Sequence, residues 1–314
     1  PGQSRYTTAR NEGDEVEILS GVLEGQTTGT PISMIVRNKD QRSHDYGNIA
    51  NTYRPGHADF GFDSKYGIRD YRGGGRSSGR ETIGRVAAGA IAAKILKELG
   101  ITLQAYTNSI GPVFCQTYHP EVIRENSFYM PDMVAAKNAI KYLESCMRKD
   151  DSAGGVIECR INGVPAGIGD PVFGKLDAAF AQALMSIGAV KAVEIGDGTK
   201  VSTMKGSENN DGFHMENGKI VKTSNHSGGI LGGISDGGEI LLRAHIKPTP
   251  SISKPQQTVT KTGEDISIEI KGRHDPVIVP RAVVVVESMA AITLVDAMFS
   301  NMSARMDYLK DFYL

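Results

Sequence analysis

The chain has 314 residues, of which 39% are hydrophobic and 23% are charged, and its formal net charge is −1. This composition is typical of a globular protein with a large core. No run approaches the ~20 apolar residues that cross a bilayer, and a net charge near zero argues against nucleic acid or a membrane surface as the partner.

The first predicted element is a hairpin. Val16 and Ile18 alternate with charged residues, as in a half-buried strand. A turn at residues 25–29 follows, and then an apolar run over residues 32–36. Residues 37–76 are polar and rich in Gly and Arg, with no clear periodicity, which indicates a long functional loop.

A helix is predicted next. Ser78 and Glu81 have the spacing of a capping box, in which each side chain satisfies a free N–H group at a helix start. The helix continues to about Leu99, and Gly100 ends it. Its many Ala and Gly residues predict close packing in the interior.

The rest of the chain alternates between both kinds of element. A last long helix is expected to begin near Arg281 or Glu287 and to continue past Met302. Further helices are predicted over residues 132–148 and 176–187, and strands over residues 155–161, 239–246 and 266–270.

The glycine-rich segment 69–82 is a candidate anion site. It leads into the capped helix, whose free N–H groups and dipole favour a negative ligand. Arg72, Arg76 and Arg80 add planar donors that suit phosphate and carboxylate groups. The alternative is a solvated basic loop capped for stability. The local excess of arginine in a neutral chain favours a small anionic ligand.

His57 is a candidate proton-transfer residue. It follows Arg54-Pro55-Gly56, a rigid turn that holds the imidazole in one orientation. Neighbouring arginines disfavour the cationic form of the ring and lower its pKa. Such a histidine transfers protons near neutral pH, although a lone loop histidine is more often an incidental surface residue.

Other polar segments are less specific. Arg273 and Asp275 lie close together, which suggests either a structural ion pair or a carboxylate kept ionised as a base. Residues 247–251 add a cation and hydroxyls, and residues 224–229 add polar groups before a glycine-rich turn. Three cysteines without a C-x-x-C pair predict reduced thiols in a cytoplasmic protein, with no disulfide framework and no metal site.

These segments, taken in order, resemble the chorismate synthase family. DYRGGGRSSGRET and RPGHAD are highly specific, whereas KPTPS alone would mean little. The matching stretches are Gly25–Ile32, Arg54–Asp59, Asp70–Ala88, Ala183–Gly196, Ser224–Gly233, Lys247–Ser251 and Gly272–Pro276.

The resemblance implies an α+β fold, a β-α-β sandwich with long central helices between antiparallel sheets, as one domain over residues 1–314 that assembles as a homotetramer. It also implies a lyase of the shikimate pathway to aromatic amino acids. The reaction is the anti-1,4-elimination of phosphate from 5-enolpyruvylshikimate 3-phosphate, which gives chorismate and requires reduced FMN. The arginine-rich loops would hold the phosphate and carboxylates of this substrate.

The family's pattern also assigns roles to residues. His57 matches the histidine beside the flavin, and Asp275 matches the carboxylate that assists proton removal. Arg5 matches a position linked to NADPH, the possible reductant. The flavin contacts implied by the resemblance are Arg76, Ser77, Ser78, Gly188, Ala189, Gly232, Lys247, Pro248, Thr249, Pro250, Ser251 and Arg273.

One departure from the family's pattern leaves alternatives open. The Gly-Glu-Ser-His-Gly motif, whose histidine protonates the leaving phosphate, does not occur in the 314 residues. We therefore expect a domain that lacks the family's N-terminal segment. The alternatives are a truncated, catalytically impaired form that binds flavin or anions, and a flavin oxidoreductase that uses NADPH on its own account.

Overall fold

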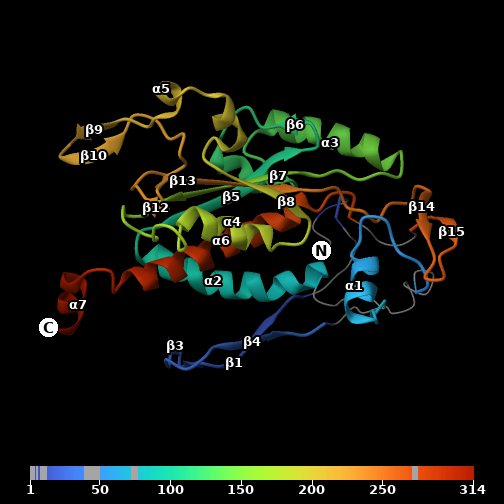
Figure 1. The fold of residues 1–314 in the computed structure, drawn as a ribbon, viewed down its shortest axis with the longest axis horizontal. Coiled ribbons are helices and arrows are strands. Elements are labelled where there is room, and N and C mark those ends of the chain that lie inside the picture. The colour runs from blue at the N-terminus through green and yellow to red at the C-terminus, as the bar shows by residue number, and fades with distance from the viewer. Residues whose placement is uncertain (1–3, 5, 8–12, 39–49, 72–76, 271–274) are drawn as a thin grey trace. The chain divides into compact units, whose positions relative to one another are not determined.

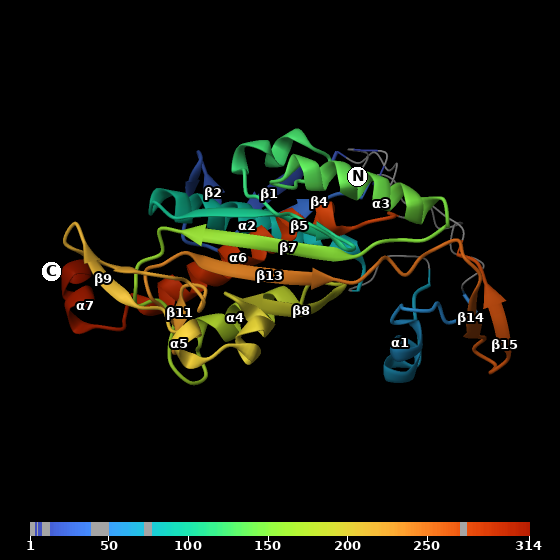
Figure 2. The same ribbon diagram turned by 90° about the horizontal axis from the view of Figure 1, so that it is seen from above.

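The computed structural model describes residues 4, 6, 7, 13–38, 50–71, 77–270 and 275–314 (Figures 1 and 2). The chain divides into two compact units. Unit 1 comprises residues 1–87, 109–155 and 247–280, and unit 2 comprises residues 88–108, 156–246 and 281–314. The single domain expected from the sequence stays a prediction.

Unit 1 begins with the predicted hairpin. Strand β1 (Val16–Ser20) pairs antiparallel with β4 (Ser33–Val36), and β2 (Val22–Leu23) pairs with β3 (Gln26–Thr27). Glu24 and Gly25 both have positive φ, at 49° and 79°, as a two-residue type I′ turn requires. The hairpin is confirmed, and its tight turn begins one residue before the predicted one.

The segment 37–76 was predicted as a loop, which is wrong for its middle part. Helix α1 (Asp59–Tyr66) lies within it and ends at Gly67, whose φ is +71°. Two glycine-containing turns flank this short helix and hide its periodicity in the sequence. Its first residue, Asp59, is buried and accepts ion pairs from two arginines, so tertiary contacts stabilise it.

Helix α3 (Met133–Met147) confirms the helix predicted over residues 132–148. Asp132 caps it, since its Oδ1 accepts from the backbone N–H groups of Val134 and Ala135 at 2.9 and 3.0 Å. The other described elements of unit 1 are η2 (Gly79–Glu81), β6 (Val113–Phe114), η3 (Pro120–Glu125), β14 (Gln256–Val259) and β15 (Asp265–Ile268).

The core of unit 2 is a sheet covered by helices. Its strand order is β5-β7-β13-β8, with β5 at Thr102–Ile110, β7 at Gly155–Asn162, β13 at Ile240–Ile246 and β8 at Val190–Ile195. Helices α2 (Thr82–Glu98), α4 (Leu176–Met185) and α6 (Val279–Asn301) lie on one face of it (Figures 1 and 2). The predicted α+β class is confirmed, as are the predicted helices α2, α4 and α6 and the predicted strands β7 and β13, whereas β5 and β8 were not predicted.

Close packing between α2 and α6 explains the Ala- and Gly-rich sequence of α2. A Cβ atom at Gly89 would lie 2.3 Å from the Cβ atom of Ser288. Helix α6 is apolar and long enough to cross a membrane by length and composition, but Val286, Ala290 and Leu294 are fully buried in the core of unit 2. It ends at Asn301, before the predicted end, and α7 (Met306–Tyr313) follows.

The remaining elements of unit 2 are short and follow β8 in the sequence, before β13. Strands β9 and β10 form an antiparallel hairpin, as do β11 and β12. Their bounds, with those of two short helices, are η4 (Gly198–Thr203), α5 (Gly206–Asn209), β9 (Phe213–Glu216), β10 (Lys219–Lys222), β11 (Ile230–Leu231) and β12 (Ile234–Ser235).

Candidate active site

Two segments that are far apart in the sequence meet in unit 1. Ser251 Oγ lies 3.1 Å from His57 Nε2, and Lys247 Nζ donates to the carbonyl oxygen of Gly56 at 2.6 Å. Gly56 has a φ of +71°, and a Cβ atom there would lie 2.7 Å from the Cβ atom of Pro250. Glycine is therefore required at this position. We call residues 54–59 and 247–251 the His57 cluster.

Hydrogen bonds determine the tautomer of His57. Its Nδ1 lies 3.0 Å from the carbonyl oxygen of Pro55, and a carbonyl oxygen only accepts, so Nδ1 carries the proton. In the neutral ring Nε2 then accepts from the Ser251 hydroxyl. Burial, and next the positive charge of Arg54, lower the pKa of His57 from its usual 6.5. The lowered pKa agrees with the prediction made from the neighbouring arginines.

A buried ion pair supports the loop that carries His57. Arg54 Nε and Nη2 donate to the two carboxylate oxygens of Asp59 at 2.8 and 2.9 Å, and Arg69 Nη1 lies 2.8 Å from Asp59 Oδ2. Burial would raise the pKa of Asp59, but the hydrogen bonds from Arg54 lower it to about 2. Both guanidinium groups thus form ion pairs with Asp59. The sequence did not predict this, since the arginine-rich loops were assigned to the substrate.

The two predicted serine contacts lie at the start of a helical segment in unit 1. Ser77 is exposed, and Ser78 Oγ accepts from the N–H group of Arg80 at 3.3 Å. The predicted cap is confirmed at Ser78, whereas the Glu81 carboxylate binds Arg85 Nε at 2.9 Å. The predicted contacts Arg5, Arg76 and Arg273 lie outside the described residues.

Asp275 is half-buried and begins a segment that contacts residue 153. Val277 forms a parallel bridge with Ala153, whose N–H group donates to the carbonyl oxygen of Pro276 at 2.9 Å. Nearby, the Ser152 hydroxyl donates to the carbonyl oxygen of Thr249 at 2.6 Å. Residues 152 and 153 thus contact the His57 cluster on one side and the Asp275 segment on the other.

Three other predicted flavin contacts belong to unit 2. Gly188 and Ala189 connect α4 to β8, and Ala189 has a φ of +73°, which is uncommon for a residue with a side chain. Gly232 lies in the turn between β11 and β12, with a φ of +61°. A Cβ atom at Gly188 or Gly232 would meet nothing within 4 Å. The backbone at both positions is therefore open to a ligand.

A buried hydroxyl group in the His57 cluster bears on whether a flavin fits there. Within the described part of the chain, Thr249 Oγ1 is buried and has no hydrogen-bond partner. A buried hydroxyl without a partner costs roughly 1–3 kcal/mol. A ligand with hydrogen-bonding groups removes this cost, so the residues present fit a polar cofactor such as FMN.

Residues 224–229 do not offer their polar groups to a ligand. The carboxylate of Asp211 accepts from Ser224 Oγ and from the backbone and hydroxyl groups of Ser227. Lys222 Nζ lies within 3.3 Å of Asp211, Asn225, Ser227 and Asp236. Burial would raise the pKa of Asp211, but the hydrogen bonds from Ser224, Ser227 and the His226 N–H group hold it well below its usual range. We call this group the Lys222 network.

A third polar group spans strands of the unit 2 sheet. Glu158 on β7 is 4% exposed, and its carboxylate binds Arg243 Nε at 2.6 Å and Arg160 Nε at 3.2 Å. The Tyr106 hydroxyl also donates to Glu158, and burial raises the pKa of this tyrosine. No sequence pattern predicted this group, because its members come from separate strands.

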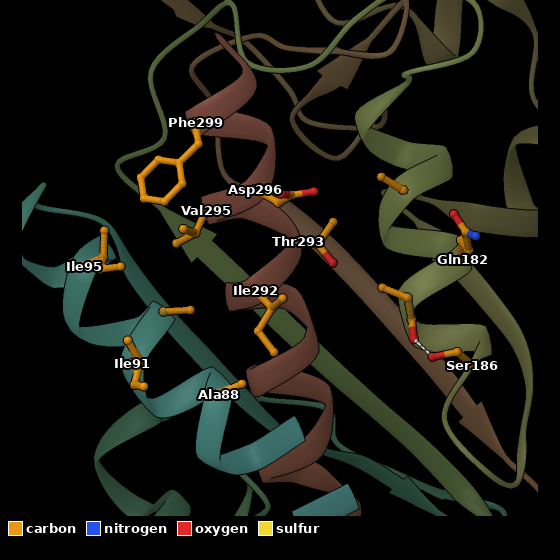
Figure 3. Close-up of a pocket in the computed structure, with 13 residues that line it drawn as sticks. Ala88, Ile91, Ile95, Gln182, Ser186, Ile292, Thr293, Val295, Asp296 and Phe299 are labelled. Atoms are coloured by element: carbon orange, nitrogen blue, oxygen red, sulfur yellow. Dashed lines mark hydrogen bonds between the residues drawn. The ribbon is translucent and has the colours of Figure 1, made fainter. Parts of the chain in front are cut away.

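A cavity of about 740 Å³ lies in unit 2 between α2, α4 and α6 (Figure 3). Aliphatic side chains such as Ile91, Ile292 and Val295 form most of its wall, and Gln182 and Asp296 are among its few polar residues. The wall has none of the predicted site residues and no cationic side chain, so this cavity does not suit an anionic substrate.

Comparison with known proteins identifies the family. The pattern of the family "Chorismate synthase" matches residues 1–299. A chorismate synthase from Lachnoclostridium phytofermentans is 64% identical over 317 residues, which cover all of this chain and 86% of that protein. One from Methanocella arvoryzae is 56% identical over 96% of this chain and 82% of that protein.

A solved structure described as a crystal structure of chorismate synthase superposes with a TM-score of 0.73 at 31% identity and covers 94% of this chain and 82% of that one. The 64% identity with the Lachnoclostridium phytofermentans enzyme, which extends over all of this chain, favours the enzyme over a form that only binds flavin or anions. The chain therefore belongs to the chorismate synthase family, the lyases that eliminate phosphate from 5-enolpyruvylshikimate 3-phosphate to make chorismate.

Proposed function

We propose that the His57 cluster forms the flavin-facing wall of the active site. The observation that carries this proposal is the fixed imidazole of His57, held between the Pro55 carbonyl and the Ser251 hydroxyl with a lowered pKa. Reduced FMN, when bound, lends electron density to the breaking C–O bond and recovers it afterwards. The protein supplies the orientation and the proton positions around that chemistry.

His57 sets the protonation state on this wall. Because Nδ1–H is committed to the Pro55 carbonyl, Nε2 is the atom that exchanges a proton. Its lowered pKa keeps Nε2 unprotonated at neutral pH, ready to accept a proton and to return it. The Ser251 hydroxyl keeps the ring in place between these events.

The cationic groups in this part of the site are unequal. Arg54 and Arg69 are bound to Asp59, so they stabilise the loop. Lys247 donates to the Gly56 carbonyl, and an ammonium group carries three N–H donors. Lys247 is therefore our candidate cation for the phosphate of FMN or of the substrate, which is itself a phosphate with two carboxylates.

The other assigned residues complete the proposal. Asp275 acts as the carboxylate that assists proton removal, and Thr249 gives its buried hydroxyl to the flavin. In unit 2, Ala189 and the open backbone at Gly188 and Gly232 are assigned as FMN contacts. The remaining contacts are Arg76, Ser77, Ser78, Pro248, Pro250 and Arg273, with Arg5 near NADPH.

The wider setting follows the family. We assign a homotetramer in the cytoplasm that takes 5-enolpyruvylshikimate 3-phosphate as its substrate, without nucleic acid or membrane as partners. NADPH serves only to reduce the flavin. A protein that oxidised NADPH as its main reaction would consume it in step with product, and this separates the oxidoreductase alternative from the lyase.

The test is an anaerobic assay with dithionite-reduced FMN and 5-enolpyruvylshikimate 3-phosphate. We expect chorismate, detected by its absorbance, with flavin in catalytic amounts and no stoichiometric use of NADPH. Binding of FMN without chorismate would instead support the impaired binding form. Stoichiometric NADPH consumption would support the oxidoreductase.

A further inference from the structure

A short segment between α3 and β7 touches both parts of the proposed site in unit 1. The Ser152 hydroxyl donates to the Thr249 carbonyl at 2.6 Å, and Lys254 Nζ donates to the Asp151 carboxylate at 2.6 Å. The Ala153 N–H group donates to the Pro276 carbonyl at 2.9 Å. Three consecutive residues therefore bind residues 249 and 254 on one side and residue 276 on the other.

This segment is itself held at both ends. The N–H group of Asp151 donates to the Cys146 carbonyl in the last turn of α3 at 3.0 Å. The carbonyl of Gly154 accepts from the N–H group of Gly111 at 2.8 Å. At Gly155 a Cβ atom would lie 2.1 Å from the Ser109 carbonyl oxygen. Residues 151–155 thus form a support that cannot shift without breaking backbone contacts.

We infer that Ser152 is a positioning residue of the active site, which through its hydrogen bond to the Thr249 carbonyl holds residues 247–251 so that Ser251 meets His57. The inference rests on the proposed role of His57. Thr249 lies between Lys247 and Ser251, the two residues whose side chains bind residues 56 and 57. A rotation of the backbone at Thr249 therefore displaces both contacts together.

Replacing Ser152 by alanine tests this. We expect Ser152→Ala to lower kcat about 10- to 100-fold, as small misplacements at an active site do, with KM little changed. In imidazole ¹⁵N NMR the pKa of His57 should rise, since the Ser251 donor that stabilises the neutral ring is lost, while burial and Arg54 still hold it below its ordinary value. Ser152→Thr keeps a hydroxyl donor and should restore both.

A matched control removes a similar bond elsewhere. Ser235 Oγ in unit 2 donates to the Pro165 carbonyl at the same 2.6 Å. Ser235 Oγ also accepts from the Ile168 N–H group at 2.9 Å, so Ser235→Ala should lower stability at least as much as Ser152→Ala and leave the NMR titration of His57 unchanged. The inference is overturned if Ser152→Ala leaves kcat and the His57 titration as in the unsubstituted protein, or if Ser235→Ala moves the titration equally.

A second variant decides the matter where Ser152→Ala does not fold. Asp151 is half-exposed, and Asp151→Asn weakens its contacts with Lys254 and with the Ser152 N–H group. A smaller shift of the His57 titration in the same direction supports the inference, and no shift overturns it. If His57→Ala retains full turnover, the proposed role of His57 fails. If His57→Ala loses turnover while Ser152→Ala has no effect, only the positioning role of Ser152 fails.

Discussion

The His57 cluster of unit 1 and the Lys222 network of unit 2 are similar in composition, but they differ in how many of their polar groups are hydrogen-bonded. Each combines a lysine, hydroxyl side chains, a histidine and a turn that contains glycine. Lys222 Nζ has four acceptors within 3.3 Å and its side chain is 6% exposed. Lys247 Nζ donates to the Gly56 carbonyl, and in the same cluster the buried Thr249 hydroxyl has no partner among the described residues.

The difference separates a structural polar cluster from one suited to a ligand. A network in which every donor and acceptor is paired stabilises the native state and has little left for binding. A cluster with an unpaired buried group is less stable until a ligand supplies the partner. Polar density in the sequence does not distinguish the two, because both motifs are conspicuous there.

The largest expected effect is on catalysis at His57. His57→Ala should lower kcat about 10²- to 10⁴-fold, the usual contribution of one acid–base group, because it removes the Nε2 atom that exchanges the proton. FMN affinity should change little. Steady-state kinetics and flavin titration measure these quantities. A kcat equal to that of the unsubstituted protein would show that His57 takes no part in the chemistry. The His57 cluster and the Lys222 network would then not differ in this role.

Lys222→Met should act on stability alone. It leaves the carboxylates of Asp211 and Asp236 buried, with side chains 1% and 7% exposed, and among the described residues Lys222 is the cation paired with both. Removal of one partner from a buried ion pair costs about 3–5 kcal/mol. We expect a fall of that size in the free energy of unfolding in urea. The exposed Lys219→Met is the control, expected within about 0.5 kcal/mol of the unsubstituted protein. A kcat loss in the folded fraction would contradict a purely structural role.

Gly56→Ala should damage both properties of the His57 cluster. The positive φ costs an alanine about 1–2 kcal/mol, and contact with Pro250 adds to this. We expect a total destabilisation of about 2–3 kcal/mol and a lower kcat, measured by urea unfolding and by kinetics. Gly67→Ala, also at a φ of +71° but with no neighbour within 4 Å, isolates the effect of conformation. Equal kcat losses in both variants would show that contact with Pro250 is unimportant.

The smallest expected effect is the acid sensitivity of the Arg54–Asp59 pair. The pKa of Asp59 is about 2 in the folded chain, against its ordinary value of 3.8, so the pair contributes its full stability above pH 3.8. That contribution, up to about 2 kcal/mol, is lost as pH falls from 3.8 toward 2. Urea unfolding at about pH 5.5 and about pH 3 measures it. Asp59→Asn should show a smaller difference between the two pH values, and an unchanged difference would mean that other carboxylates carry it.

Much of the fold was predictable from local patterns. Alternation around Val16 and Ile18, the cap at Ser78 and the Ala-rich run that ends at Gly100 each predicted the right element. Each of these signals depends on neighbours within one or two turns of chain. The prediction failed at α1 and at the end of α6, where no strong local signal exists and distant contacts decide.

The candidate site shows the same division. The RPGHAD and KPTPS motifs named His57 and Lys247, and the sequence correctly predicted a lowered histidine pKa. It assigned the arginine-rich loops as a group to the substrate, whereas the structure pairs Arg54, which lies in one of them, with Asp59. It gave no indication of Ser152, since a serine after two aspartates has no pattern of its own.

The amino-acid sequence was sufficient for the family, the element types and the chemistry that the motifs carry, because propensity, capping and motif spacing are properties of neighbouring residues. The folded chain was needed to show that residues 56 and 57 touch residues 247–251, that Arg54 serves Asp59, and that Ser152 supports Thr249. These contacts join residues from about 100 to almost 200 positions apart, or depend on burial. Hydrogen bonds and burial act through space, so only the folded chain reveals which polar groups are already paired.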